Sequence, residues 1–446
     1  MQRNKLLLFT LVMIGSLYSM GQAGTSSPYT IAGLGELKSG NFLQHQAMGG
    51  TSISQVNRGV FTATNPATYA NIDFTVFDAG IKATLGKVSN STESANMSSG
   101  NFNHFAMAFP FGTKKKMGVS FGTNQYSDVG YDIRNNVNVD TPSYYDLFAG
   151  EGGISRVYAG YGMELFKNFK LGANVNYNFG NIQEVQARIY PNTNNVFSFG
   201  DERLIAYRGI DYTIGVQYSV QQKGRNETGI KEGVLHTLGA AFQSNSDLRG
   251  KGFHSITTFY GTEYEATGDP DFLDQILLEE DQRDTLTKPL GFTLGYTASK
   301  GDNWSVSLET EQNQWSGVTD KKTGNVFFDN VRYSAGFSIV PSPKYSERGD
   351  FFKKVKYSAG VRYENLYYNF QNTQLNELGI SFGLGLPVVR SFRLEEEKVA
   401  VVSMINLTAE YVKRGTTDNG LIQQDFFNIG IGLNLNDKWF TKRKYQ

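Results

Sequence analysis

The sequence predicts an all-β fold, a transmembrane antiparallel β-barrel of about fourteen strands, and three observations support this prediction. Fourteen segments alternate apolar residues with small polar ones, which is the period of a β-strand. Of the 446 residues, 49 are glycine and 13% are aromatic, a combination typical of neither a disordered chain nor an average globular one. After residue 23, no stretch has the ~20 consecutive apolar residues of a membrane-spanning helix. If the protein lies in a membrane, a closed barrel is the other structure that satisfies every backbone hydrogen bond in lipid.

The first 23 residues have the features of a secretory signal peptide. Arg3 and Lys5 precede an apolar run over residues 6–18, and Gly21 and Ala23 place small residues just before the expected cut. We therefore expect cleavage after Ala23 and export of the remaining chain. A membrane anchor is the weaker interpretation, because the run is too short and too polar to span a bilayer.

Charge and cysteine content exclude several classes of function. The chain has 42 Lys and Arg against 42 Asp and Glu, so it lacks the clustered positive charge that nucleic acid requires. Because there is no cysteine, disulfides, cysteine-bound zinc, iron–sulfur clusters and catalytic thiols are excluded. The expected partner is an outer-membrane lipid bilayer and not a nucleic acid.

The alternating segments have the length and the number that a bacterial barrel requires. In the last of them Phe427, Ile429 and Ile431 alternate with Asn428 and Gly430, whereas a soluble sandwich would carry Lys, Glu and Thr on its outer face. Each segment is near or above the ~9–11 residues of a tilted membrane strand, and single-chain bacterial barrels have even strand numbers. The segments are 74–87, 102–111, 116–126, 154–165, 169–181, 207–221, 234–244, 290–299, 303–311, 329–340, 354–366, 376–387, 400–412 and 425–437.

Connection lengths give an independent test of a barrel and predict its orientation. Very short turns at 112–115, 166–168 and 300–302 contrast with long connections at 127–153, 182–206 and 245–289. Outer-membrane barrels have short periplasmic turns and long external loops, so we expect the outer membrane of a Gram-negative bacterium with both termini in the periplasm. The basic tail 441–446 would then lie in the periplasm. Three further periplasmic connections, at 222–233, 341–353 and 388–399, are longer than this rule predicts.

Aromatic residues near the strand ends are expected to form girdles at the two membrane interfaces. Tyr and Trp favour the headgroup region because part of each ring is apolar and part can stay hydrated. Packing as ordinary core aromatics is the alternative. The residues concerned are Tyr126, Tyr296, Trp304, Trp315, Tyr363, Tyr411, Trp439 and Phe440.

The segment 24–73 does not alternate and contains Ala47-Met48-Gly49-Gly50 and Asn65-Pro66-Ala67. Together with fourteen strands, it resembles the FadL-type family of outer-membrane transporters for long-chain fatty acids and hydrocarbons. Short motifs in the second half, Lys288-Pro289, Gln314-Trp315-Ser316, the run 332–336 and the run 383–387, are similar to that family as well. The resemblance covers nearly the whole mature chain, although each motif is short.

This resemblance implies a lumenal hatch over 24–73 inside a barrel over 74–440, with a kinked strand that opens a lateral gap in the wall. A hydrophobic small molecule would be captured by the loops 182–206 and 245–289 and would leave through that gap. Pro66 cannot donate to a sheet and Asn65 is biased to extended geometry, which suits an irregular hatch, as does the close approach that Gly49 and Gly50 permit. An ordinary turn is the alternative for Asn65, Pro66 and Ala67.

Within the loop 245–289 we expect a short helix with an apolar face. Phe272, Leu273, Ile276 and Leu277 would share that face and form a ligand groove, and a solvated surface helix is about equally compatible with the pattern. The surrounding acidic residues would repel a free carboxylate, so a simple fatty acid is doubtful as the substrate.

The sequence gives no support for catalysis, a metal site or a cofactor. None of the four histidines has another histidine four residues on, as zinc helices require. His104 should face the lumen, and a lipase pairing with Ser120 is a remote alternative. Lys82 and Arg362 fall on the polar side of their strands with Glu309, Glu364 and Glu410; they either hold the hatch in a network or bind a substrate headgroup.

Two functions therefore remain open at this stage. The leading expectation is passive uptake of hydrophobic small molecules, which predicts a continuous apolar cavity with a wall gap beside Asn65-Pro66-Ala67. The alternative is a structural or docking barrel of a secretion or surface-assembly complex, with a protein partner in the envelope. That alternative predicts a filled lumen and an exposed apolar patch on the rim.

Overall fold

The computed structural model describes residues 25–439 except 113–115, 138–141, 192–195, 227–228, 261–263, 265–271, 321–323, 346, 348 and 395–396. The expected signal peptide, Phe440 and the basic tail lie outside the described residues.

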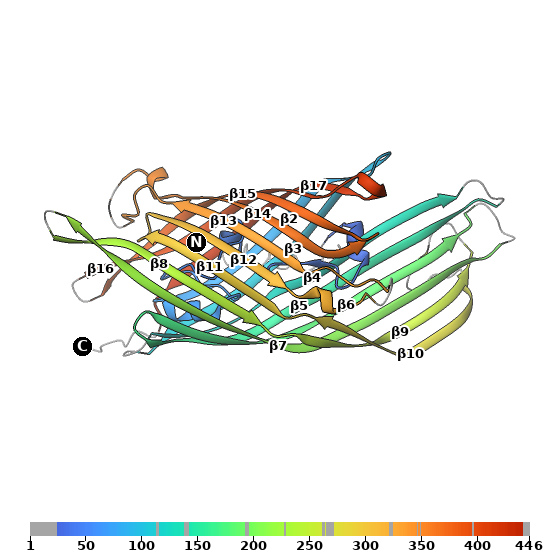
Figure 1. The fold of residues 1–446 in the computed structure, drawn as a ribbon, viewed down its shortest axis with the longest axis horizontal. Helices are drawn as coiled ribbons and strands as arrows, with labels where there is room; N and C mark the ends of the chain where they lie inside the picture. Colours follow the sequence, from blue (N-terminus) through green and yellow to red (C-terminus); the bar gives the residue numbers. More distant parts are fainter. Residues whose placement is uncertain are drawn as a thin grey trace, which may run out of the picture.

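The wall is a closed antiparallel barrel of fourteen strands, which confirms the predicted fold class (Figure 1). Neighbours in sequence pair around the ring, β8 pairs with β11, and β17 closes the ring against β2. The wall strands are β2 (Thr75–Ser89), β3 (Ser94–Phe111), β4 (Met117–Val137), β5 (Tyr144–Phe166), β6 (Phe169–Ile189), β7 (Ser198–Asn226), β8 (Gly229–Gln243), β11 (Gly291–Lys300), β12 (Trp304–Asn313), β13 (Asn330–Ile339), β14 (Lys356–Phe370), β15 (Thr373–Leu394), β16 (Glu397–Gly415) and β17 (Gln423–Asp437).

The outward face of the wall is apolar and the inward face is polar. On β17, Phe427, Ile429 and Ile431 are half exposed, whereas Asn428 and Asn434 on the other face of the strand are buried in the lumen. A charge on the lipid face of such a wall would cost ~2–4 kcal/mol at the membrane midplane. The arrangement is that of a membrane-spanning barrel. In the described part of the chain, no helix has the length and apolar character of a membrane span.

The long connections are mostly strand and not loop, which corrects the prediction for 127–153, 182–206 and 245–289. The chain there continues as the upper parts of β4 to β7 and as two more strands, β9 (Ser246–Phe259) and β10 (Phe272–Lys288). β9 pairs with β7 and with β10, so six strands project beyond the wall as one curved sheet, at the right of Figure 1. We call this projection the rim sheet, its end of the barrel the extended rim, and the other end the opposite rim.

At the opposite rim, two of the longer connections are also hairpins. β7 and β8 continue to within a few residues of each other at 226–229, as do β15 and β16 at 394–397. Only the connection 341–353 is mainly irregular, with the short turn η5 (Phe352–Lys354).

The rim sheet stands outside the apolar belt. On β7 the outward face carries Ile210, Tyr212 and Ile214, and then Arg208 toward the extended rim. Because exposed arginines are costly within the hydrocarbon region, the membrane boundary on this side lies near Ile210.

Four of the predicted girdle aromatics fit that role and two do not. Tyr296, Tyr363, Tyr411 and Trp439 are exposed on the outside of the wall. Trp315 is instead buried at the mouth of the lumen, and Tyr126 faces the lumen with its ring 4.5 Å from the Arg156 guanidinium. Both rings lie on the lumen side because β4 and the chain after β12 turn inward at these positions.

Residues 25–73 lie inside the barrel and fill the lumen. This segment comprises η2 (Pro28–Ile31), β1 (Glu36–Leu37), α2 (Leu43–Gln46) and η3 (Pro66–Asn71). Two further turns, η4 (Trp315–Gly317) and η6 (Asp418–Gly420), lie between strands at the extended rim. Residues 42–73 pack toward the opposite rim around Phe42, Phe61 and Tyr69, and residues 25–38 pack toward the extended rim.

Candidate functional site

The hatch motif Asn65-Pro66-Ala67 rests on a floor of wall glycines. Four glycines lie side by side across four strands: Gly118, Gly162, Gly172 and Gly215 of β4 to β7. A Cβ added at Gly172 would lie 2.3 Å from the Pro66 carbonyl carbon, and one at Gly215 would lie 2.0 Å from the Asn65 side-chain oxygen. Only glycine allows this approach of hatch backbone to wall.

Asn65 fixes the start of η3 and ties it to the wall. Its side-chain oxygen accepts a hydrogen bond from the Ala67 amide at 3.1 Å, which is a helix N-cap, and Pro66 occupies the first turn. Its amide nitrogen donates to the carbonyls of Ile53 at 2.7 Å and of Val216 on β7 at 3.2 Å. The motif is therefore a buried anchor and not an exposed turn.

Gly49 and Gly50 anchor the hatch on the other side of the lumen. Both have positive φ, and a Cβ at Gly49 would lie 2.7 Å from the Val361 carbonyl oxygen. The Gly49 amide donates to the Ser381 hydroxyl at 3.0 Å. Close approach, which the sequence suggested for this pair, is what the structure has.

Buried ion pairs connect the hatch with the wall, and Arg362 and Arg414 are at their centre. Arg362 contacts Glu377, Glu410 at 2.6 Å and Glu364 at 3.4 Å. Arg414 also pairs with Glu377, and it reaches Glu36 of the N-terminal segment at 3.0 Å.

Glu309 adds a second attachment of the hatch. One oxygen of its carboxylate accepts the backbone amides of Ser52 at 2.7 Å and Ile53 at 3.0 Å. The contacts of Glu309, Arg362 and Arg414 therefore favour the interpretation in which the lumenal charges form a network over the one in which they bind a substrate headgroup.

The cavity inside the lumen is small and polar. Its volume is about 160 Å³, below the ~300–1,000 Å³ of usual ligand pockets. Six acidic and six basic side chains line it, so it is neither apolar nor of one charge: Glu36, Lys38, Lys82, Arg156, Glu309, Glu311, Arg332, Arg362, Glu364, Glu377, Glu410 and Arg414.

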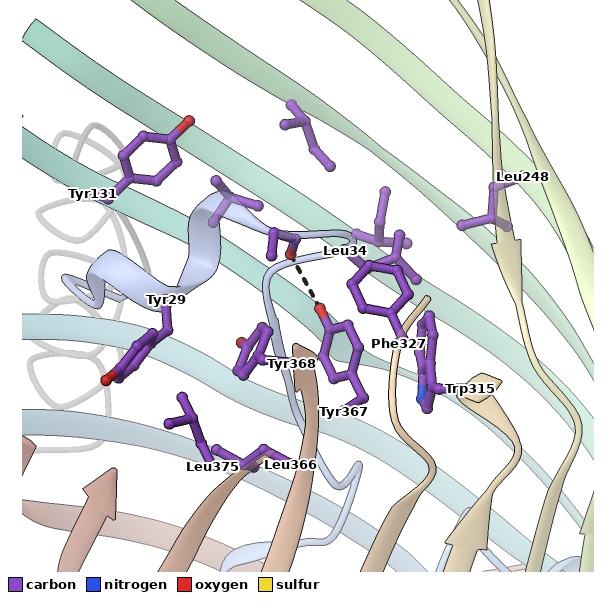
Figure 2. Close-up of a cluster of buried hydrophobic side chains, with 14 of the residues drawn as sticks. Tyr29, Leu34, Tyr131, Leu248, Trp315, Phe327, Leu366, Tyr367, Tyr368 and Leu375 are labelled. Atoms are coloured by element: carbon purple, nitrogen blue, oxygen red, sulfur yellow. Dashed lines mark hydrogen bonds between the residues drawn. The ribbon is translucent and has the colours of Figure 1, made fainter. Parts of the chain in front are cut away.

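An aromatic cluster closes the mouth of the lumen at the extended rim (Figure 2). Trp315 stacks on Tyr367 with ring centroids 4.4 Å apart, and Phe327 meets both rings edge-on. Tyr368 and Tyr29 continue the cluster toward the N-terminal segment. These rings come from the wall, from the β12–β13 connection and from η2, so they hold three parts of the chain together over the lumen.

The Tyr367 hydroxyl joins this cluster to the N-terminal segment. The hydroxyl oxygen lies 2.6 Å from the Gly35 carbonyl oxygen and 3.2 Å from the Ala32 carbonyl oxygen, and it can donate to either. The contact with Ala32 is drawn in Figure 2. We expect Tyr367→Phe to lower the free energy of unfolding by ~1–3 kcal/mol, because the buried Gly35 carbonyl loses its hydroxyl donor, whereas the Ala32 carbonyl keeps the Gly35 amide. Urea unfolding in detergent micelles measures this. Tyr363→Phe, on the outward face of the same strand, is the control and should change stability by under ~0.5 kcal/mol; an equal loss in both variants would contradict the assignment.

Pairing within the wall is interrupted between β3 and β4. β3 pairs with β4 only over His104–Phe111, and above this point β3 pairs with β2 and β4 with β5. Both strands have a register irregularity at this level, at Gly80/Ile81 on the β2 side and at Gln125/Ser127 on β4. Wall pairing is therefore incomplete at this level of β3 and β4.

Residues 25–38, which we call the N-terminal strap, occupy this interruption. β1 pairs with Ser127 and Asp128 of β4, and the Lys38 amide donates to the Tyr126 carbonyl at 2.9 Å. On the other side, the Ser26 hydroxyl donates to the Ser98 carbonyl of β3 at 3.0 Å. The strap thus bridges the two strands. The Asn65-Pro66-Ala67 motif lies elsewhere, on β5 to β7, so the predicted association of motif and gap is wrong.

The three predicted lumenal residues all face the lumen but have different surroundings. Arg362 lies in the ion-pair network, and Lys82 lines the cavity with no ion pair within 4.0 Å among the described residues. His104 is buried, bonds Asp78 at 2.7 Å and stacks on Phe42 at 4.2 Å. Ser120 instead hydrogen-bonds Tyr158, so the two residues of the remote lipase alternative do not meet.

The predicted apolar helix at 272–277 is wrong, because this stretch is the first part of strand β10. Leu273 and Ile276 are exposed, and Leu277 is partly buried. Pairing with β9 extends through this stretch with irregular register, which the helical spacing of apolar residues concealed. Within the described part of the chain, no three His, Asp or Glu side chains come together as metal ligands would.

The mouth cluster and the strap were not predicted from sequence. One signal was present: Leu366, Tyr367 and Tyr368 are three large residues in a row and break the alternation of their strand. The structure has all three buried at a register shift in β14. Such a break marks a place where a wall strand turns side chains into the lumen.

Fold and lumen together define a membrane-spanning barrel of FadL type with an internal hatch. The chain belongs to the BamG family, whose model matches residues 1–446. Its structure is similar to a FadL homologue from Pseudomonas aeruginosa (13% identity, 90% of this chain and 99% of that chain, TM-score 0.56). It is also similar to the P. putida toluene transporter TodX (15% identity, 90% of this chain and 100% of that chain, TM-score 0.55). A third similar structure is the Ralstonia pickettii toluene transporter TbuX (13% identity, 89% of this chain and 98% of that chain, TM-score 0.51). No curated protein matches the chain in sequence at a significant level.

Proposed function

We propose that the protein is a docking barrel of a cell-envelope assembly, anchored in the outer membrane of a Gram-negative bacterium with its extended rim outward and its C-terminal end in the periplasm. The observation that carries this proposal is the filled lumen. Hatch and mouth cluster close the two ends, and the space between them is small and lined with charges. Transfer of a hydrophobic molecule from lipid into such a cavity would be unfavourable, because it would displace water from charged side chains without replacing their hydrogen bonds.

The rim sheet supports the same proposal. It projects beyond the apolar belt and exposes apolar side chains such as Leu273, Ile276 and Leu278 to water. Exposed apolar residues on a projecting sheet mark an interaction surface. Family membership is compatible with this function, whereas the resemblance to hydrocarbon transporters carries the fold only.

Passive uptake of hydrophobic small molecules by lateral diffusion is the second candidate, and the interruption between β3 and β4 favours it. The cavity reaches this point through Asn101, Asn124 and Tyr126, and the strap is the only part of the described chain that pairs with the edge of β4 there. Release of the strap would open a path from the lumen to the membrane. Substrate capture would then involve the rim sheet in place of the helix expected from sequence.

One experiment on cells separates the two functions. We expect deletion of the protein to leave uptake of a hydrophobic tracer unchanged, and full-length protein extracted in mild detergent to carry a partner protein in fixed stoichiometry. Uptake that falls on deletion, and that also falls in a Pro66→Ala variant of normal abundance, together with protein that purifies alone, would instead establish transport.

A further inference from the structure

The outer edge of β10 has no partner strand among the described residues. The backbone of β10 pairs with β9 on one side, and no described residue pairs with it on the other. The neighbouring wall strand β12 ends at Asn313, well before the level of this edge, and the chain there turns into η4. The regular part of β10, from Gln282 to Lys288, continues into an irregular part from Phe272 to Glu279.

A groove beside this edge has the volume of a ligand site. It measures about 660 Å³, within the ~300–1,000 Å³ usual for such sites. Its walls combine apolar and acidic side chains from β7, β9, β10 and Tyr264 of the β9–β10 connection. The residues that matter for the argument are Glu202, Phe253, Tyr264, Leu273, Leu278 and Glu280.

Glu202 is a buried carboxylate that has no cation beside it in the described part of the chain. It is 4% exposed and accepts hydrogen bonds from the Gln183 amide at 2.8 Å and the Tyr264 hydroxyl at 3.1 Å. Among the described residues no Lys, Arg or His nitrogen lies within 4.0 Å of it. A buried carboxylate gains most from a positive partner, and here the position for one is in the groove.

The edge carries a strong negative charge. From Leu273 to Thr287 the strand has five carboxylates and one cation, Arg283. Asp281 is neutralised by Lys251 and Arg283, but Asp274, Glu279 and Glu280 have no ion pair within the described chain. Charge and irregular register on an edge strand discourage random pairing between sheets. They also select for a strand of opposite charge.

We propose that the free edge of β10 and its groove bind an extended, basic segment of a partner protein by adding a strand to the rim sheet. Backbone pairing would supply affinity, as in other cases of strand addition. A lysine or arginine of the segment would lay its aliphatic part against Leu278 and place its charge at Glu280, with the carboxylate of Glu202 at the far side of the same groove. This inference rests on the proposed docking function.

Other occupants fit less well. The protein's own basic tail follows β17, which ends at the opposite rim, whereas β10 lies at the extended rim, so we assign the site to a segment of another protein. Anionic headgroups would be repelled by the carboxylates. A metal ion is disfavoured because the acidic side chains do not converge within the described residues.

Binding of a defined peptide to purified full-length protein in detergent micelles tests this inference. The probe is a short fluorescent peptide of alternating lysine and valine with blocked ends, and anisotropy reports binding. We expect it to bind more tightly than the glutamate–valine analogue and than the same peptide N-methylated at alternate residues, which cannot pair as a strand. Glu280→Lys should weaken binding by about tenfold or more, Glu202→Gln should weaken it by a smaller factor because Glu202 lies two strands further in, and added salt should weaken it as well.

Asp132→Lys is the matched control, because Asp132 is an exposed acid at the other edge of the rim sheet and should leave binding unchanged. Equal binding of the N-methylated peptide, equal competition by spermine, or an effect of Asp132→Lys as large as that of Glu280→Lys would overturn the inference. If a partner protein still accompanies the Glu202→Gln and Glu280→Lys variants, the docking function stands and only this site is wrong. If the wild type purifies alone, the docking function itself fails.

Discussion

Replacing Arg414 by methionine is expected to lower the free energy of unfolding by ~3–5 kcal/mol, because it leaves buried carboxylates without their cation. The Arg414 side chain is 5% exposed and Glu377, its partner, is 3% exposed. The guanidinium also holds Glu36 of the strap at 3.0 Å, and its charge lies 5.1 Å above the Phe426 ring. Methionine has a similar length but no charge, so the loss reports the ionic contacts more than the packing.

The effect should extend from stability to the strap. Burial opposes ionisation of Glu36, but the charges of Arg414 and Lys38 outweigh it and hold the pKa of this carboxyl well below its usual range. With Arg414 gone, Glu36 loses its strongest electrostatic partner, and β1 should leave β4 more often. Urea unfolding in micelles measures the first effect, and hydrogen exchange at residues 25–38 measures the second.

A control variant and a double variant make this prediction specific. Lys413→Met removes the same charge from the adjacent, exposed position of β16 and should change stability by under ~0.5 kcal/mol. Combining Arg414→Met with Glu377→Gln should recover part of the loss, because removing both members of a buried pair costs less than removing one. An Arg414→Met protein as stable as the Lys413→Met protein would refute the importance of the network.

The wall was predictable from sequence because its physical cause is local. Each residue of β17 faces either lipid or lumen, so the alternation itself predicts that Phe427 faces lipid and that Asn428 faces the lumen. Strand number follows from counting such runs. The hatch could be recognised only through Asn65-Pro66-Ala67 and the lack of alternation before residue 74, because an irregular segment has no period of its own.

What could not be predicted depends on contacts between distant parts of the chain. The sequence predicts a helix at the start of β10 because Leu273, Ile276 and Leu277 have helical spacing, whereas bulges in its pairing with β9 produce that spacing in a strand. Trp315 resembles an interface residue in sequence and is buried only because Tyr367 and Phe327 reach it from other segments. For the charged residues of the lumen, the alternation predicts which face of the wall they lie on but not which residues they pair with.

Replacing Gly172 by valine is expected to displace the hatch without breaking the wall. The new Cβ would lie 2.3 Å from the Pro66 carbonyl carbon, and the neighbouring Gly162 and Gly215 leave Pro66 no space to shift along the floor. Crowding of this kind costs ~1–3 kcal/mol, whereas valine itself suits a β-strand. Since the barrel hydrogen bonds are untouched, the cost should fall on the docking of η3.

Limited proteolysis of the protein in membranes detects this, with cleavage sites in residues 39–73 mapped by mass spectrometry. We expect cleavage within the hatch to rise in Gly172→Val while the barrel fragment keeps its heat-modifiable migration on a gel. Gly100→Val is the matched control, because Gly100 also lies within a wall strand, β3, and a Cβ there meets no atom within 4 Å. If both variants are cleaved like the wild type, the glycine floor does not determine where the hatch lies, and the filled lumen must be held by its ion pairs alone.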